Sequence, residues 1–240
     1  MRRFDRRALA TIIVAVGVVL TGCSSSAETE PVTIGELPGD VGPAIELSDD
    51  LDEYGSLQAW PSACDLVTDE TLTALLPQIE QITRTPEAVS YEVQGIDLIQ
   101  VPGGIHAEEA RCEIAYTIPI GMLASNPGVL HIEVLAAGSP EFVELNLDPA
   151  STTELDVEGG TCGFAADGIR CLDQSGRLHF RMSFSLPHHG PSLKDPSRYV
   201  HQGETVSFTT DSQDDQARNE FIDEHLTFPI MSSILDRLAG

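Results

Sequence analysis

Apolar and polar residues alternate along the central part of the chain, with the period of a β-strand that has one buried face. The alternation is clearest over residues 178–186, where every second side chain is apolar: Leu178, Phe180, Met182, Phe184 and Leu186. Shorter runs of the same period lie at residues 89–93, 112–118 and 130–134, and residues 205–209 are expected to add an edge strand. The pattern predicts an antiparallel sheet with one covered face, whose polar face carries His179 and Arg181.

Two turn signals precede the longest predicted strand. Asp167-Gly168 is a dipeptide typical of tight β-hairpins, and residues 173–176 supply a second turn into the strand that follows. We therefore expect residues 162–186 to form a meander of antiparallel strands.

Helical spacing of apolar residues predicts one helix before the sheet and two after it. The first covers residues 65–76, with Thr68 as its N-cap. A second helix, capped by Asp211 or Ser212, is expected to run to residue 226 and to bury Ala217, Phe221 and Ile222. A third follows Pro229. The fold class is thus predicted to be α+β, an antiparallel β-sheet with helices packed on one face.

The first 23 residues have the pattern of a lipoprotein leader. Four arginines precede an apolar run of about a dozen residues, too short to cross a bilayer, which needs about 20. Leu20-Thr21-Gly22-Cys23 then resembles a lipobox, so residues 1–22 are predicted to be a signal peptide and Cys23 the lipidated anchor on the outer face of the cell membrane. An ordinary signal peptide with an incidental cysteine is the alternative, and the export route, Sec or twin-arginine, stays open.

The chain after the predicted anchor changes in composition. Residues 23–54 are rich in Ser, Glu, Pro, Gly and Asp with little periodicity, which predicts a flexible tether with a reach of roughly 30 Å. Residues 55–240 have the length of a single extracytoplasmic domain with its own core.

The cysteine content agrees with export. With Cys23 lipidated, four of the five cysteines remain, and an even number outside the cytosol indicates two disulfides. Four cysteines allow three pairings, and the spacing favours Cys64–Cys112 with Cys162–Cys171. Four free thiols or a zinc site are the alternatives, although no C-x-x-C pair is present.

The charge of the chain is strongly negative and excludes one class of partner. The sequence has 13 Lys and Arg against 38 Asp and Glu; removal of residues 1–22 takes away four arginines and one aspartate, which leaves nine against 37 and a formal charge of −28. Such a surface repels nucleic acid, whose binders need basic patches, and also anionic lipid headgroups. It fits solubility, or a cationic partner.

Candidate catalytic and metal-binding groups are few. His188-His189 is the most suggestive pair, but adjacent side chains of an extended loop point apart and would not readily bind one ion. The acidic run that begins at Asp211 lacks the ligand spacing of a calcium-binding EF-hand. The sequence has neither a G-x-S-x-G nucleophile motif nor a phosphate-binding loop, so no cofactor and no metal is expected.

A family resemblance rests on short motifs. Cys64-Asp65-Leu66-Val67-Thr68 at the start of a helix, followed by Cys112 in a strand, resembles a family of small actinobacterial lipoproteins of unknown function. That family has a lipobox, a polar tether and a helical C-terminus, and the resemblance covers about residues 60–238. The chain departs from the family in having Ile114 where a tryptophan is common, and the pair Cys162–Cys171 is not part of the family pattern. A looser likeness is to two-disulfide sensor domains of actinobacterial receptor kinases.

These observations favour a non-enzymatic binding or interaction module, held at the cell envelope through the lipid on Cys23. Its partner would be a small amphipathic ligand between helices and sheet, or an envelope protein on the polar face of the sheet. The alternatives are an envelope hydrolase that uses His188, His189 and a carboxylate such as Asp195, and a structural spacer without a ligand.

Overall fold

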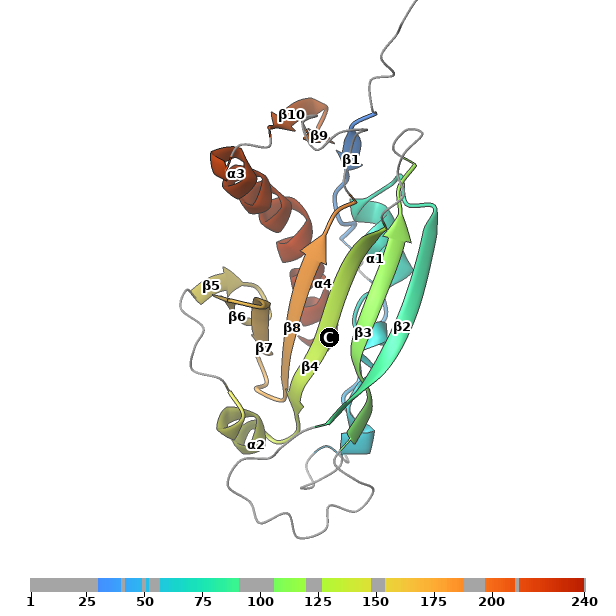
Figure 1. The fold of residues 1–240 in the computed structure, drawn as a ribbon. Helices are drawn as coiled ribbons and strands as arrows, with labels where there is room; N and C mark the ends of the chain where they lie inside the picture. Colours follow the sequence, from blue (N-terminus) through green and yellow to red (C-terminus); the bar gives the residue numbers. More distant parts are fainter. Residues whose placement is uncertain are drawn as a thin grey trace, which may run out of the picture.

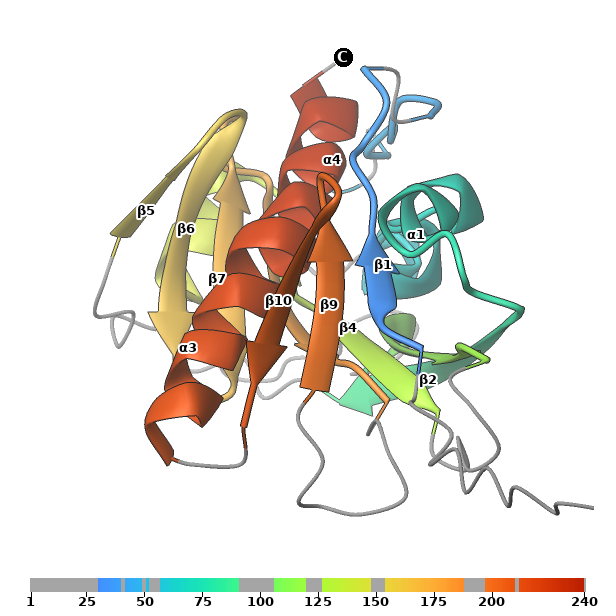
Figure 2. The ribbon, with the colours of Figure 1, turned by 90° about the horizontal axis from the view of Figure 1, so that it is seen from above.

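The chain folds around a seven-stranded sheet that is covered on one face by a long C-terminal helix (Figures 1 and 2). The structure, a computed structural model, describes residues 30–39, 42–48, 51, 57–90, 106–119, 127–147, 154–187, 197–209 and 212–239. The predicted α+β class, the antiparallel sheet with helices on one face and the two disulfides are confirmed.

Every neighbouring pair in the large sheet is antiparallel, as the alternation predicts. Its strands, in spatial order, are β2 (Gln81–Ser90), β3 (His106–Thr117), β4 (Gly128–Ala137), β8 (Leu178–Ser185), β7 (Gly168–Asp173), β6 (Gly160–Ala165) and β5 (Glu154–Val157). The strand expected at residues 89–93 begins earlier and is described only to Ser90. The hairpin between β6 and β7 turns at Ala166 and Asp167, and Gly168 takes a φ of +133° that favours glycine.

On the covered face of the sheet, apolar side chains form rows that run across neighbouring strands. Cys112, Ile132, Met182 and Ile169 are register partners across four strands, and all are buried. A second row joins Val134, Phe180 and Cys171 in the same way. This face packs against the C-terminal helix, so the main core lies between the two.

The C-terminal helices form one continuous rod instead of two helices broken at Pro229. Its parts are α3 (Ser212–Ile222), a π-helical turn (Asp223–Thr227) and α4 (Phe228–Ala239). Proline lacks an N–H and its ring clashes with the carbonyl four residues earlier, which is that of His225. The wider π turn lies over this position, where the N–H of Phe228 bonds to the carbonyl of Asp223 five residues back, and the rod can therefore continue. Ala217, expected to be buried, is exposed on α3.

The remaining helices are short. The 3₁₀ turns η2 (Leu57–Ala59) and η3 (Ala63–Asp65) precede α1 (Asp69–Leu75), whose N-cap Thr68 accepts the N–H of Thr71 as predicted. Helix α1 packs on α4, and α2 (Pro140–Leu145) follows β4 and packs against it.

The N-terminal segment differs from the flexible tether that the sequence predicted. Within residues 23–54, β1 (Val32–Ile34) is a strand that pairs in parallel with β9 (Ser197–His201), and Val32 and Ile34 are buried. Strand β10 (Glu204–Phe208), the expected edge strand, completes this separate three-stranded sheet. A three-residue strand carries too little periodicity to be recognised, and its partner is more than 160 residues away.

Further contacts fix this N-terminal strap, residues 32–39 and 42–48, to the domain. Gly35 donates its N–H to the carbonyl of Leu75 over 2.9 Å, and a Cβ at Gly35 would lie 2.1 Å from the carbonyl oxygen of Ala74. Near the other end, the N–H of Ile45 bonds to the carbonyl of Arg237 on α4 at 2.7 Å. The ordered domain therefore includes the strap and starts well before residue 55.

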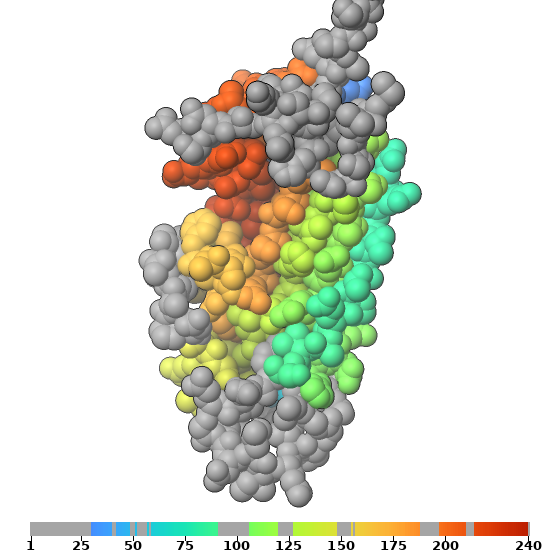
Figure 3. All heavy atoms as spheres, in the orientation of Figure 1, coloured from blue at the N-terminus to red at the C-terminus, as the bar shows by residue number. Residues whose placement is uncertain are grey.

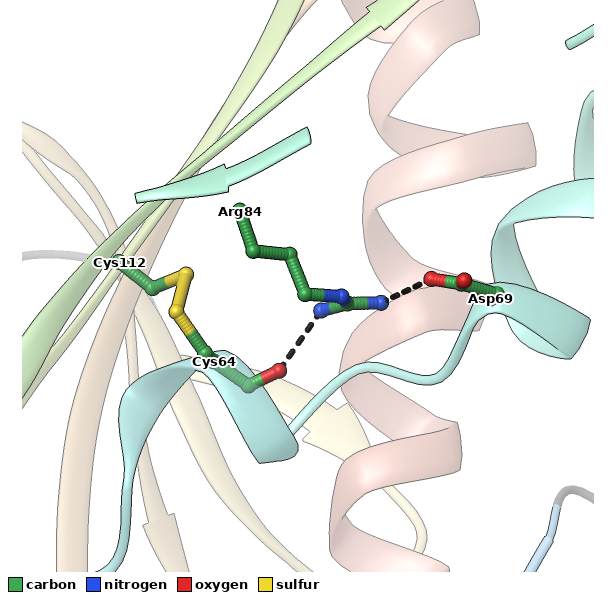
Figure 4. Close-up of a disulfide and its surroundings, with 4 residues drawn as sticks. All are labelled: Cys64, Asp69, Arg84 and Cys112. Atoms are coloured by element: carbon green, nitrogen blue, oxygen red, sulfur yellow. Dashed lines mark hydrogen bonds and ion pairs between the residues drawn. A yellow bond between two sulfur atoms is a disulfide. The ribbon is translucent and has the colours of Figure 1, made fainter. Parts of the chain in front are cut away.

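The two disulfides lie at different places in the fold. Cys162–Cys171 joins register partners of the β6–β7 hairpin, whereas Cys64–Cys112 ties η3 to the covered face of β3. Arg84 on β2 reinforces the second link, since it donates to the carbonyl of Cys64 at 2.7 Å and forms an ion pair with Asp69 in the first turn of α1 (Figure 4).

Candidate functional site

Only some of the candidate residues named from the sequence lie in the described part of the chain. Cys23, His188, His189 and Asp195 lie outside the described residues. Arg181 is on the polar face of β8 as predicted, but His179 is buried, with 4% of its surface exposed. His179 pairs with Ala136, which is also buried, so this part of the polar face is covered.

The uncovered face of the sheet carries a row of charged side chains. Glu87, Arg111, Glu133, Arg181 and Arg170 are successive register partners across β2, β3, β4, β8 and β7. These strands form the surface seen in Figure 3, without a helix over its centre. The predicted polar face is therefore a cross-strand charge ladder.

Glu133 is the centre of this ladder. Its Oε2 atom accepts hydrogen bonds from Arg111 Nε at 3.2 Å and Nη2 at 3.1 Å, and it also pairs with Arg181. Arg181 in turn pairs with Asp167 of the β6–β7 turn, which holds Arg170 at 3.1 Å as well. The ladder lines a depression of about 370 Å³, but its charges already neutralise one another. It is suited to holding the strands in register rather than to binding an ion.

A second hollow lies at the end of the covered face. This α3 pocket has a volume of about 390 Å³ and opens between the end of β8, strand β9 and helix α3. Its size falls within the range of small-molecule sites. The described residues that line it are Phe184, Ser185, Leu186, Pro187, Ser197, Tyr199, Arg218, Asn219, Ile222 and Asp223.

The α3 pocket is lined by apolar side chains on one side and by polar side chains on the other. Apolar side chains come from the end of β8 and from Ile222, whereas hydroxyl, amide, guanidinium and carboxylate groups come from β9 and α3. The predicted period-two pattern places Phe184 and Leu186 on the covered face, yet both are only half-buried. The apolar layer is thus incomplete at this end of the sheet, and the lining suits a molecule with an apolar and a polar part.

Burial and charge act together on the polar wall. Tyr199 is 2% exposed, and this burial raises the pKa of its hydroxyl, while the nearby charge of Arg218 and a hydrogen bond with Ser197 lower it in part. Burial likewise raises the pKa of Asp223, against the effect of the hydrogen bond from the Thr227 hydroxyl. The wall combines a cation with a carboxyl group whose charged form is disfavoured.

An aromatic cluster supports the wall from behind. Tyr199 and Phe208 of the small sheet pack against Phe221 of α3, with ring centroids 5.6 Å from it. Beside them, the rings of His201 and His225 are stacked at 4.2 Å. Stacked imidazoles do not direct two nitrogens at one ion, and no group of three metal-ligating side chains occurs in the part of the chain that the structure describes.

Several of these residues were not found from sequence. Tyr199, Arg218 and Asp223 come from strand β9 and from a helix at positions that carry no motif, and their proximity depends on packing between distant segments. The best signal in the sequence would have been the last two apolar positions of the alternation, Phe184 and Leu186. They lie where the strand runs past the edge of the core.

Comparison with known proteins adds no relative: no protein-family model, no curated protein and no solved structure matches the chain. In the described ranges, no helix is both long and apolar enough to cross a bilayer. The fold and site thus define an α+β domain with a mixed polar and apolar pocket.

Proposed function

We propose that the protein is a non-enzymatic binding protein of the cell envelope, anchored through lipid on Cys23, that holds a small amphipathic molecule in the α3 pocket. The observation that carries this proposal is the pocket itself, which lies between helix and sheet and has an apolar and a polar wall. Lipidation, the extracytoplasmic location and the likeness to actinobacterial lipoproteins rest on the sequence motifs.

The chemistry of the lining favours binding over catalysis. Among the described residues that line the pocket there are hydroxyl groups and one carboxyl group, but no histidine or cysteine. A hydroxyl nucleophile needs a base within hydrogen-bond reach to become reactive. The Asp223 carboxylate accepts a hydrogen bond from Thr227, which does not line the pocket, and it is bonded to neither of the two serines among the described lining residues.

Native mass spectrometry tests the proposal. The full chain is produced in an exporting bacterial host, purified from membranes and weighed in native and denatured form. We expect a native adduct that is lost on denaturation, and a denatured mass that starts at Cys23, includes acyl chains and lacks four hydrogens for two disulfides.

A matched pair of variants locates the adduct. Asn219 and Ala217 are both exposed on α3, two residues and thus about 200° apart around the helix, and Asn219 lines the pocket. We expect Asn219→Trp to remove the adduct and Ala217→Trp to retain it. An adduct that survives Asn219→Trp, or a wild-type protein without any adduct, would contradict the proposal and direct attention to protein partners of the charge ladder.

A further inference from the structure

We infer that the molecule bound in the α3 pocket is an amphiphile with an anionic head group, a carboxylate or a phosphate, and that Arg218 binds that group. The inference rests on the proposed function and specifies its ligand. It is carried by the position of Arg218, the weakness of its present ion pair and the place where the chain enters the fold.

Arg218 supplies the positive charge of the pocket. Among the described lining residues it is the one basic side chain, in a protein whose acidic residues outnumber basic ones almost threefold. Its charge acts on Tyr199, in the same polar wall, whose hydroxyl pKa it lowers. A guanidinium group is well suited to carboxylate and phosphate, since its planar donors can bind two oxygens at once.

The present partner of Arg218 can be exchanged at little cost. Arg218 Nη2 lies 3.3 Å from Asp215 Oδ1, one turn earlier on α3, and roughly a quarter and a half of the two side chains are exposed. Ion pairs this open to solvent contribute little to stability, because water and salt screen them. A ligand that inserts its apolar part beside Phe184 and Ile222 can therefore replace Asp215 with its own anionic group.

The chain enters the fold beside this pocket. Val32, the first residue of β1, is the register partner of Tyr199 in the pocket wall. Nine residue steps separate Cys23 from Val32, and even a fully extended chain of that length spans only about 30 Å. An anchor at Cys23 thus keeps the pocket close to the membrane, where amphiphiles are concentrated.

Titration of the full chain with single-chain amphiphiles, below their micelle concentrations, tests the inference. The probes are dodecanoate, dodecyl phosphate and the uncharged dodecyl maltoside, with affinity measured by calorimetry. We expect one or both anionic probes to bind at least tenfold more tightly than the maltoside. The tighter of the two identifies the head group.

Three variants assign the contact. We expect Arg218→Gln to weaken anionic binding at least tenfold and leave the maltoside unchanged, and Asp215→Asn to strengthen anionic binding severalfold. Arg198→Gln, which removes the same charge from β9 outside the pocket lining, should change neither. Equal binding of all probes, insensitive to Arg218→Gln, would overturn the anionic assignment but leave the pocket in place. Absence of binding by every probe, or binding that survives Asn219→Trp, would overturn the proposed function as well.

Discussion

The two faces of the seven-stranded sheet are made by the same strands but hold them together in different ways. On the covered face, the row Cys112–Ile132–Met182–Ile169 is buried against the helix. One residue along each strand, the row Arg111–Glu133–Arg181–Arg170 faces outward. Ion pairs join its first three members, and Asp167 bridges Arg181 and Arg170. Burial of apolar area contributes far more per residue than exposed ion pairs do. The covered face should therefore determine stability, while the outer face tunes register and solubility.

The largest expected effect is on the covered face. Phe180 is fully buried at the centre of β8, between Val134 and Cys171. Phe180→Ala should lower the free energy of unfolding by about 3–5 kcal/mol, because it removes apolar contacts and leaves a cavity. Urea denaturation followed by circular dichroism measures it. Ser183→Ala, on the outer face of the same strand, should stay within about 0.5 kcal/mol. Similar costs at both positions would contradict the division between the faces.

A second comparison sets a buried arginine against an exposed one. Arg237 on α4 is 6% exposed and donates to the carbonyls of Pro43, Leu66 and Asp65 at 2.8–3.3 Å. Arg237→Ala should cost about 2–4 kcal/mol, since it leaves buried carbonyl oxygens without donors and frees the N-terminal strap.

Arg111→Ala, on the outer face, is the matched control for the loss of an arginine. Its side chain is 39% exposed, and we expect a cost of at most about 1 kcal/mol in the same denaturation experiment. Protease cleavage within residues 32–48 should accelerate in the Arg237 variant alone. If the strap stayed protected there, Arg237 would not be what fixes it.

The charge ladder should give a smaller effect that depends on salt. Glu133 is 7% exposed and is shared by Arg111 and Arg181, so Glu133→Gln leaves two neighbouring cations without their common anion. We expect a loss of about 1–2 kcal/mol at low ionic strength, shrinking in 1 M NaCl because salt screens exposed charges. Glu113→Gln changes the net charge equally on the same face and should cost about 0.5 kcal/mol or less. A loss at Glu133 that is independent of salt would show that packing, not charge, is involved.

Local rules predicted the central strands of the large sheet and the presence of the first helix, but not strand β5 or the start of β2. Period-two alternation predicted β3, β4 and β8, and the turn residues around Asp167 and Asp173 predicted the meander, because each signal lies within the element it specifies. The N-cap Thr68 and the pair Cys162–Cys171 followed from equally local signals, whereas Cys64–Cys112, 48 residues apart, was favoured from the spacing of all four cysteines.

Long-range packing decided the features that sequence reasoning missed. Strand β1 is buried only because β9 lies beside it, and the polar composition around it predicted a tether instead. Pro229 predicted a break, but a π turn earlier in the helix accommodates the ring. His179 was placed on the polar face correctly, but nothing in β8 itself shows that this end of the polar face is covered. The α3 pocket has the same origin, since its walls come from three separate segments.

The smallest expected effect is on the pH dependence of stability, and it arises in the helix that packs on the covered face. Burial lowers the pKa of His225, the neighbouring His201 lowers it further, and Glu224 partly opposes them. The folded chain therefore binds a proton at His225 less readily than the unfolded chain, in which histidine has a pKa of about 6.5. The resulting stability is present above that pH and declines as the pH falls from about 6.5 towards the lower folded pKa.

Thermal unfolding between pH 7.5 and 5.5 measures this contribution. Asp223 and Asp236, whose pKa values burial raises, act in the opposite sense, since they favour the folded state as they take up protons; they are the same in the wild type and in both variants. We expect the decline in melting temperature to be shallower in His225→Gln than in the wild type. His131→Gln, which removes an imidazole from the exposed outer face, should keep the wild-type slope. If His131→Gln flattened the curve and His225→Gln did not, the outer face and not the helix-covered face would govern the response to acid.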